Sequence, residues 1–339
     1  MLIRNRPSWE LPEGIVTPEH LVMNRRGLLR TAGAFAAAGI IAGCDRNTAQ
    51  NVTSDPAKIA AANTPDPSAS LYPVKTNDAF KSADREITAE QLVTSYNNYY
   101  EFGVDKSDPV RNADALPIRP WEISIEGMVE APIKTDFDTL LKAMPLEERV
   151  YRHRCVETWS YAAPWSGFPM KALIEYAKPM SGAKYVVMKS FMNPDAAPAQ
   201  GPQSLIYGTP WPYTEGLTIA EASNDLAFMV TGAYGKPLPK QNGAPLRLAT
   251  PWKYGFKSTK GIQRFIFTIE RPKTYWMALG PDEYGFWANV NPNVPHPRWS
   301  QSSEEILGTG MRVPTKLYNG YGEHVSGLYA NLQDEHLFM

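Results

Sequence analysis

Residues 151–160, Tyr-Arg-His-Arg-Cys-Val-Glu-Thr-Trp-Ser, form the densest group of reactive side chains in the sequence. We expect a strand over residues 149–156, and Cys155 lies on it. Three residues that are or can be cationic come directly before this thiol: Arg152, His153 and Arg154. Nearby positive charge stabilises a thiolate and lowers the thiol pKa, and a thiolate is a soft ligand that suits transition metals. The stretch therefore indicates a reactive or metal-binding cysteine.

Two other interpretations of Cys155 stay open from the residues alone. It could be a small side chain buried in the core. It could also be the nucleophile of a Cys-His hydrolase with His153, although side chains two apart on a strand are usually too distant for a direct hydrogen bond. The sequence contains no HExxH, CxxC, P-loop, GxGxxG or GxSxG motif and only five His. A site with several histidine ligands is therefore not expected.

The surrounding sequence predicts short strands with interspersed helices. Residues 88–91 have the spacing of a capping box, so we expect a helix to begin there. Two more helices are expected, over residues 137–144 and from Pro169 onward. Five more strands are expected over residues 121–129, 185–188, 226–230, 246–248 and 265–269. Without a regular βαβ period, the fold class is α+β in a single domain.

Composition and charge exclude several classes of protein. Hydrophobic residues make up 43% of the 339 residues, which excludes a wholly disordered chain. The formal net charge is −1, so we expect no nucleic-acid partner. The 30 Pro exclude a helical bundle, because Pro breaks helix interiors. Residues 281–297 are too rich in Asn and Pro for regular structure, and we expect them to form an ordered loop on the surface.

The first 44 residues have the order of parts expected of an export signal. Residues 24–30, Asn-Arg-Arg-Gly-Leu-Leu-Arg, resemble a twin-arginine signal, and an uncharged run follows over residues 31–43. That run is too short to span a bilayer. An N-terminal amphipathic helix is the alternative. We therefore expect residues 1–44 to be a signal peptide that engages the twin-arginine export machinery, which carries folded proteins and favours cofactor uptake before export.

Residues 41–44, Ile-Ala-Gly-Cys, resemble a lipobox. Cys44 is then either lipidated or removed with the signal, and both outcomes place the protein in the periplasm, in the first case with a lipid anchor. Residues 45–75 are small, polar and Pro-rich and are expected to be a flexible tether. Residues 76–339 are expected to form the domain. A lone Cys155 in the mature domain excludes an internal disulfide framework.

Two further stretches indicate an anion site. Residues 241–247 contain an Asn-Gly turn that we expect to feed a strand presenting Arg247. Residues 251–261 contain three Lys, two hydroxyl residues and two Gly, a composition suited to gripping an anionic group. A solvated basic loop is the alternative. The position of Arg247 near this loop in the sequence favours a phosphate.

Five segments together resemble a known family: residues 96–103, 152–169, 242–247, 251–257 and 281–300. They resemble the catalytic subunits of periplasmic molybdopterin-dependent protein-methionine-sulfoxide reductases, within the sulfite-oxidase fold. The resemblance implies a molybdopterin-binding fold of mixed sheets with short helices. It also implies one molybdenum per chain, held by Cys155 together with the sulfurs of the pterin cofactor.

The resemblance implies roles for other residues as well. Those at positions that contact the cofactor or its phosphate are Asn97, Tyr100, Glu101, Ser190, Asn242, Arg247, Ser258, Thr259 and Lys260. Ser190 keeps the hydroxyl of a Thr that is familiar at its position, whereas Ser258 and Thr259 differ from the family pattern, so contacts there are expected through the backbone. Glu157 and Tyr100 are candidates for moving a proton or orienting the substrate.

The implied activity is the reduction of methionine sulfoxide in proteins by two-electron oxygen-atom transfer. This chain has no haem motif, so the family implies electrons from a membrane haem-containing subunit fed by the quinone pool, and oxidised periplasmic proteins as substrates. On the same cofactor, small-molecule sulfoxide reduction and sulfite oxidation are alternatives, the latter with Arg152, His153 and Arg154 around the sulfite dianion. The alternative that is not an enzyme is a lipoprotein interaction module with an inert Cys155.

Overall fold

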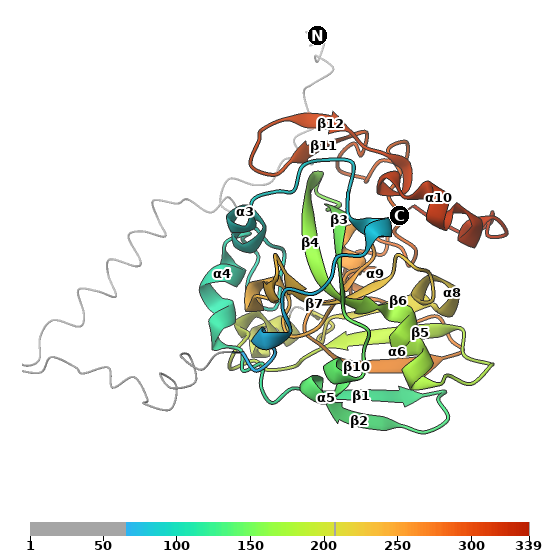
Figure 1. Cartoon of the computed structure of the whole chain (residues 1–339). Helices are drawn as coiled ribbons and strands as arrows, with labels where there is room; N and C mark the ends of the chain where they lie inside the picture. Colours follow the sequence, from blue (N-terminus) through green and yellow to red (C-terminus); the bar gives the residue numbers. More distant parts are fainter. Residues whose placement is uncertain (1–65, 207, 339) are drawn as a thin grey trace, which may run out of the picture. The chain divides into compact units, whose positions relative to one another are not determined.

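Two β-sheets organise residues 66–206 and 208–338, the part of the chain that this computed structural model describes (Figure 1). One sheet has the strand order β2-β1-β10-β5-β6. The other has the order β12-β11-β4-β7-β8, with β3 paired to β4 and β9 to β7. The predicted signal peptide and residues 45–65 of the predicted tether lie outside the described residues.

The five-stranded sheet contains strands that the sequence pattern predicts well. Its strands are β1 (Glu122–Gly127), β2 (Ile133–Asp136), β5 (Tyr185–Ser190), β6 (Thr214–Thr218) and β10 (Ile262–Thr268). Ile123 and Ile125 of β1 are fully buried, as alternation of apolar and polar residues requires when one face of a sheet packs on the core. Strands β1 and β10 run parallel, and the other neighbours are antiparallel.

The second sheet is built around β4 (Trp159–Pro169), which the sequence analysis missed. All but the last of its residues are buried, so it shows no alternation of apolar and polar side chains. It pairs with β3 (Glu147–Arg154), β7 (Phe228–Ala233) and β11 (Ser303–Ile306). The remaining strands are β8 (Lys236–Pro237), β9 (Arg247–Ala249) and β12 (Arg312–Pro314).

Cys155 lies just beyond β3 and not on it, which corrects the expected strand over residues 149–156. Strands β3 and β4 are antiparallel neighbours, and residues 155–158 close the turn between them. The Cys155 amide donates to the Trp159 carbonyl at 2.9 Å, and the Thr158 amide donates to the Cys155 carbonyl at 3.0 Å. Thr158 has a φ of +70°, an uncommon conformation for a β-branched residue that this tight turn requires.

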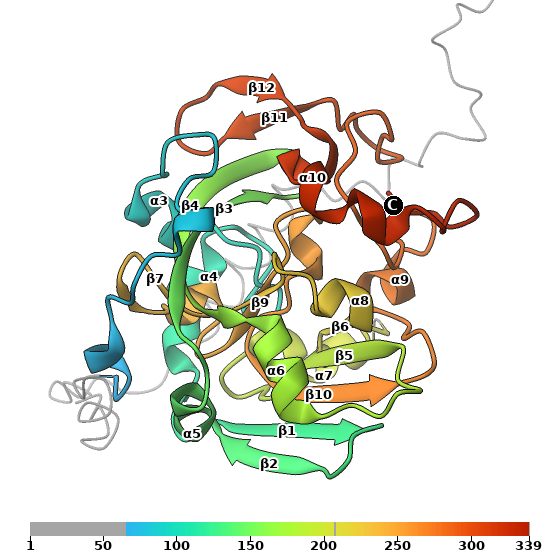
Figure 2. The same cartoon turned by 45° about the vertical axis from the view of Figure 1, so that its right-hand side comes forward.

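The helices are short and lie between or beside the sheets (Figure 2). They are α3 (Glu90–Ser95), α4 (Asp108–Asn112), α5 (Phe137–Lys142), α6 (Met170–Ala177), α7 (Pro202–Ile206), α8 (Ile219–Ala222), α9 (Tyr275–Leu279) and α10 (Gly322–Val325). The capping box expected at residues 88–91 is wrong: Ala89 is the N-cap of α3, because the Thr88 hydroxyl instead accepts from the Ala162 amide at 3.3 Å. The capping box that forms joins Thr218 and Glu221 at α8.

Two segments outside the regular elements pack more closely than the sequence suggested. Residues 66–75, which we assigned to the flexible tether, lie against the seven-stranded sheet, where the Tyr72 hydroxyl donates to the Thr231 carbonyl at 2.9 Å. Residues 281–297 contain no helix or strand, as expected, but residues 286–290 are buried and not on the surface. Apolar side chains such as Phe286 and Trp287 account for that burial.

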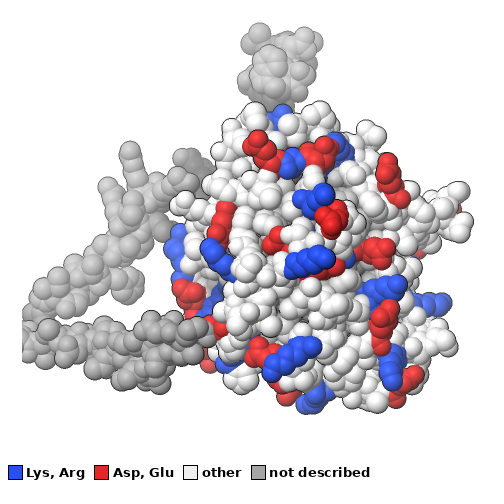
Figure 3. All heavy atoms as spheres, in the orientation of Figure 1, with Lys and Arg blue, Asp and Glu red and all other residues white. Residues whose placement is uncertain are grey.

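Charged side chains of both signs lie interspersed on the face of the described residues that Figure 3 presents. Within residues 66–206 and 208–338, no helix is both long and apolar enough to cross a membrane.

Two buried lysines fix the loop over residues 251–261, so only the third lysine of this loop stays available for the expected anion site. Lys257 Nζ lies 2.6 Å from Glu215 Oε2 on β6, and both side chains are fully buried. Lys253 pairs with Glu221 and donates to the Trp287 carbonyl at 2.7 Å. Both ammonium groups are therefore committed to internal partners, because a buried charge is stable only when paired. Lys260 remains as the lysine of this loop that pairs with no carboxylate among the described residues.

We predict that Lys257→Met destabilises the folded protein by about 3–5 kcal/mol, because it leaves Glu215 as an unpaired buried carboxylate. The double variant with Glu215→Gln should recover most of that loss. Urea unfolding of the purified proteins measures both values. Lys134→Met is the matched control, since the Lys134–Glu122 pair is exposed and should change stability by less than about 1 kcal/mol.

The same variant should show a defined pH dependence. Burial raises the pKa of Glu215 even with Lys257 present, and removal of Lys257 raises it further. The unfolded pKa of a Glu carboxyl is about 4.3. When the folded pKa is higher, the folded protein is most stable below this value, and its free energy of unfolding falls as the pH rises. The difference in free energy of unfolding between the wild type and Lys257→Met should therefore grow from pH 4 toward neutral pH. A difference that does not change with pH would contradict this role of Glu215.

Candidate active site

A cleft that is partly open to solvent brings together residues from several parts of the chain. The segment after α3 contributes Asn97 to Glu101. The turn between β3 and β4 contributes Cys155, Val156 and Glu157. Strand β9 and the following loop contribute Arg247, Ser258 and Lys260. Aromatic residues complete the wall: Tyr161, Tyr213, Phe256, Trp276 and Tyr284.

The sulfur of Cys155 faces this cleft and has only weak protein contacts. Asn98 Nδ2 lies 3.4 Å from Sγ, and the Glu157 amide donates to Sγ at 3.5 Å. Burial raises the pKa of the Cys155 thiol to about 12, and the neighbouring Glu157 carboxylate contributes to that rise. No described group of three His, Cys, Asp or Glu side chains could hold a metal ion without other ligands. Cys155 is a residue of the cleft wall that could ligate a soft metal ion through its thiolate.

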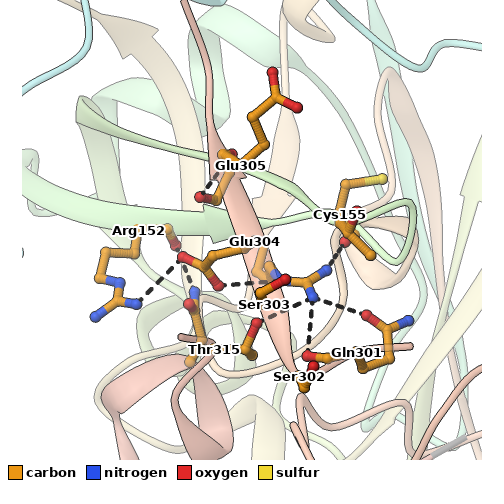
Figure 4. Close-up of polar contacts among 12 residues, drawn as sticks. Arg152, Cys155, Gln301, Ser302, Ser303, Glu304, Glu305 and Thr315 are labelled. Carbon is orange, nitrogen blue, oxygen red and sulfur yellow. Dashed lines mark hydrogen bonds and ion pairs between the residues drawn. The ribbon is translucent and has the colours of Figure 1, made fainter. Parts of the chain in front are cut away.

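The cationic residues before Cys155 do not surround its thiol, which corrects the electrostatic expectation from the sequence. Arg154 Nε lies 3.1 Å from Glu304 Oε2, and Arg152 Nη2 lies 3.5 Å from Glu304 Oε1 (Figure 4). Side chains alternate between the two faces of a strand, so residues 152 and 154 point away from the face of residue 153. The three residues consequently do not form the cationic sulfite pocket that was the alternative.

His153 is neutral and packed against aromatic rings. Its ring stacks on Tyr161 with centroids 4.7 Å apart. Burial, together with the charges of Arg247 and Lys260, holds the pKa of His153 well below its ordinary value. The loop over residues 251–261 approaches this ring so closely that a Cβ on Gly255 would lie 2.4 Å from it. Packing therefore accounts for His153, and no hydrogen bond links it to Cys155 as a Cys-His hydrolase would need.

Glu157 is an ionised carboxylate held by three donors. Its Oε2 accepts from Lys106 Nζ at 2.7 Å, Asn98 Nδ2 at 2.9 Å and Trp159 Nε1 at 3.1 Å. Burial raises the pKa of Glu157, but these hydrogen bonds outweigh it and the pKa lies below the ordinary value. A carboxylate held in this way suits orientation better than proton donation. The sequence analysis missed Asn98 and Lys106, and the doubled Asn at residues 97–98 was the available signal.

The far end of the cleft is cationic. Arg247 is buried, and its guanidinium donates to the carbonyls of Asn242 at 3.0 Å and Leu248 at 3.2 Å. Burial, together with repulsion from Arg247, lowers the pKa of Lys260 to about 7. Neither forms a salt bridge with a carboxylate among the described residues. Arg247 is a buried cation without a carboxylate partner, and an anionic group such as a phosphate would neutralise it and favour the protonated form of the partly exposed Lys260.

The structure brings together eight of the residues proposed from the sequence and places three behind them. Those that line the cleft are Asn97, Tyr100, Glu101, Cys155, Glu157, Arg247, Ser258 and Lys260. Ser190 donates to Glu101 Oε1 at 2.9 Å, and Asn242 donates to Asn97 Oδ1 at 3.1 Å. Thr259 is fully buried and its carbonyl accepts from Leu248. These three therefore support the lining and do not form part of it.

Aromatic rings near Tyr100 were not foreseen. The ring of Tyr100 lies 5.1 Å from that of Trp276, which lies 4.9 Å from that of Tyr284. Burial raises the pKa of Tyr100 far above its ordinary value, so its hydroxyl is protonated at neutral pH. The cleft thus combines a soft sulfur, a cationic end and an aromatic wall with a neutral hydroxyl.

Comparison with known proteins shows similarity to a protein family, to a curated relative and to a solved structure. A model of the oxidoreductase molybdopterin binding domain matches residues 109–276. The protein-methionine-sulfoxide reductase catalytic subunit MsrP of Burkholderia mallei (strain ATCC 23344) is 43% identical over 327 residues, which cover 95% of this chain and 94% of that protein. The crystal structure of the sulfane dehydrogenase SoxCD from Paracoccus pantotrophus matches at 13% identity with a TM-score of 0.42, over 79% of this chain and 66% of that one, just under two thirds.

Proposed function

Because the chain belongs to the family of protein-methionine-sulfoxide reductase catalytic subunits and contains their molybdopterin-binding oxidoreductase domain, we propose that it reduces methionine sulfoxide in proteins. The reaction takes place in the cleft at a molybdenum-molybdopterin cofactor, one molybdenum per chain, with Cys155 as the protein ligand. The observation that carries the proposal is that one cleft is lined both by Cys155 and by the basic residues Arg247 and Lys260.

The chain's own residues would bind the cofactor and prepare the substrate. Arg247 and Lys260 would hold the phosphate of the pterin, with Ser258 beside them. Asn97 and Glu101, held by Asn242 and Ser190, would contact its remaining polar groups. The bound cofactor supplies two-electron oxygen-atom transfer chemistry. The balanced overall change converts a sulfoxide, two electrons and two protons into a thioether and water.

The open side of the cleft suits a sulfoxide better than sulfite. The neutral hydroxyl of Tyr100 would donate a hydrogen bond to the sulfoxide oxygen, and Trp276 and Tyr284 would contact the methyl and methylene groups beside the sulfur. Ionised Glu157 would disfavour an approaching dianion, because like charges repel. Reduction of methionine sulfoxide is therefore favoured over sulfite oxidation on the same cofactor.

Features of the sequence support the proposed electron donor and the proposed cellular compartment. No haem motif occurs in the chain, so an electron donor must bind from outside, and a membrane haem-containing subunit fed by the quinone pool fits this need. The twin-arginine pattern at residues 24–30 favours export to the periplasm after cofactor loading. Oxidised periplasmic proteins would then be the substrates.

We predict that Cys155→Ser preserves the fold and abolishes sulfoxide reductase activity, because an alkoxide is a harder ligand than a thiolate. The measurement is molybdenum content with a reductase assay on an oxidised protein, beside thermal unfolding. Cys44→Ser, which changes the other cysteine of the chain, is the control and should keep full activity in the purified protein. A Cys155→Ser protein with wild-type activity would overturn the proposed ligand.

Arg247→Ala should lower cofactor retention about tenfold to a hundredfold, the equivalent of about 1.5–3 kcal/mol for a charge-assisted contact. Arg247→Lys should rescue this only in part, because lysine lacks the planar fork of arginine. Molybdenum occupancy is measured beside unfolding of the cofactor-free proteins. Arg264→Ala, which changes an exposed arginine paired with Glu126, serves as control. Unchanged occupancy with a destabilised cofactor-free protein would make Arg247 structural only.

Replacement of Arg25 and Arg26 by Lys should leave cofactor-loaded protein in the cytoplasm, because the twin-arginine machinery recognises the Arg pair. Fractionation of cells followed by molybdenum analysis of each fraction measures this. The wild-type chain is the control. Normal periplasmic accumulation of the double variant would contradict the assignment of residues 1–44 as a twin-arginine signal.

A further inference from the structure

Three arginines surround one buried carboxylate behind the turn that carries Cys155 (Figure 4). Glu304, on β11, is fully buried and accepts from Arg85 Nη2 at 2.7 Å and from Arg154 Nε at 3.1 Å, and Arg152 lies 3.5 Å away. Burial raises the pKa of Glu304, but the three guanidinium groups outweigh it and hold that pKa below its ordinary value. Glu304 is therefore a fixed anionic point that orients the arginines around it.

Arg154 links Glu304 to the backbone of the turn. With its Nε on Glu304, its Nη1 donates to the Cys155 carbonyl. Its Nη2 donates to Gln301 Oε1 at 2.8 Å and to Thr315 Oγ1 at 3.2 Å. The planar fork of a guanidinium allows little movement once all three nitrogens are engaged. The Cys155 carbonyl is thereby held toward Arg154, which is itself fixed by Glu304.

Gln301 holds the next carbonyl of the turn. Its side chain is buried, and its Nε2 donates to the Val156 carbonyl at 2.9 Å. Its Oε1 accepts from Arg154, which has only donors, so the orientation of the amide follows from its partners. Trp299 Nε1 donates to the same Val156 carbonyl at 2.8 Å. Side chains about 145 residues downstream thus hold the turn between β3 and β4.

The contact to the Cys155 carbonyl fixes the peptide plane between Cys155 and Val156, and the contacts to the Val156 carbonyl fix the next plane, between Val156 and Glu157. Cys155 lines the cleft, and its carbonyl accepts from Arg154. The sulfur itself has no strong donor to hold it, because Asn98 at 3.4 Å is its nearest side-chain donor. Its position depends on the backbone behind it, and that backbone depends on Arg154, Gln301 and Trp299.

We propose that Gln301 is a positioning residue for the molybdenum ligand: its amide joins the Arg154 guanidinium to the Val156 carbonyl and so orients the Cys155 sulfur. The inference rests on the proposed function only in taking Cys155 as the ligand. Residues that orient metal ligands from behind typically change metal affinity or activity about 10- to 100-fold when they are replaced.

Four variants of the full-length, cofactor-loaded protein test this. In Gln301→Glu the carboxylate still accepts from Arg154 but places an acceptor against the Val156 carbonyl. Gln301→Met removes both contacts without a charge, in case the first variant fails to fold. Trp299→Phe removes only the second donor to Val156. Thr315→Val is the matched control, because it removes one acceptor of Arg154 and leaves every contact to the turn intact.

The measurements are the electron paramagnetic resonance spectrum of the Mo(V) state, molybdenum content, steady-state kinetics and unfolding of the cofactor-free proteins. We expect both Gln301 variants to shift the Mo(V) spectrum and lower kcat or molybdenum retention about tenfold, with little change in KM. Trp299→Phe should shift the spectrum less, and Thr315→Val should keep the wild-type spectrum.

Two results would overturn the inference while leaving the proposed function intact. One is a wild-type spectrum and kcat in both Gln301 variants. The other is a spectral change in Thr315→Val as large as that in Gln301→Glu, which would mean general loosening of the cluster. A wild-type protein that contains no molybdenum when made with its maturation machinery would instead overturn the proposed function and this inference with it, before any variant is compared.

Discussion

The pairing of β4 with three other strands is the constraint on which the rest of the molecule depends. Strand β4 pairs with β3 on one side and with β7 on the other, and its first residues also pair with β11. A strand buried along nearly its whole length leaves its neighbours little freedom of register, because a slip of one residue would exchange its two faces. The turn before β4 carries Cys155 and β11 carries Glu304, so the same pairing brings the cleft and its support together.

The basic residues in the interior and in the cleft fall into two groups. Those of one group stabilise the fold, and those of the other could bind a ligand. Lys253, Lys257 and Arg154 are buried beside carboxylates, and their charges are neutralised within the protein. Arg247, which is buried, and Lys260, which is partly exposed, line the cleft without a salt bridge to a carboxylate among the described residues. Burying an unpaired charge is costly, so the second arrangement makes physical sense when an anion binds. Residues 251–261 contain both kinds, which explains why their composition alone indicated an anion site but not which lysine forms it.

The sequence was sufficient for the α+β molybdopterin-binding fold of mixed sheets with short helices, the family and the enzyme class, all of which are confirmed. Strands such as β1 could be predicted because one face is buried and the residues alternate. Strand β4 could not, because burial on both faces removes that alternation. The supporting residues Gln301 and Glu304 were also out of reach, since their role depends on contacts about 150 residues apart. The residue roles in the cleft remain proposals.

The basic residues next to Cys155 in the sequence wrongly suggested that they surround its sulfur. Arg154 is its direct neighbour, yet strand alternation turns the guanidinium to the opposite side, where it contacts the Cys155 carbonyl and not the sulfur. A metal ligand needs two properties that conflict at a single atom: it must be fixed in place, and its lone pairs must be free. This turn separates them, because strong donors hold the carbonyls of residues 155 and 156 while Sγ keeps only weak contacts. The cations beside the cysteine therefore act on its backbone, and the sulfur stays open toward the cleft.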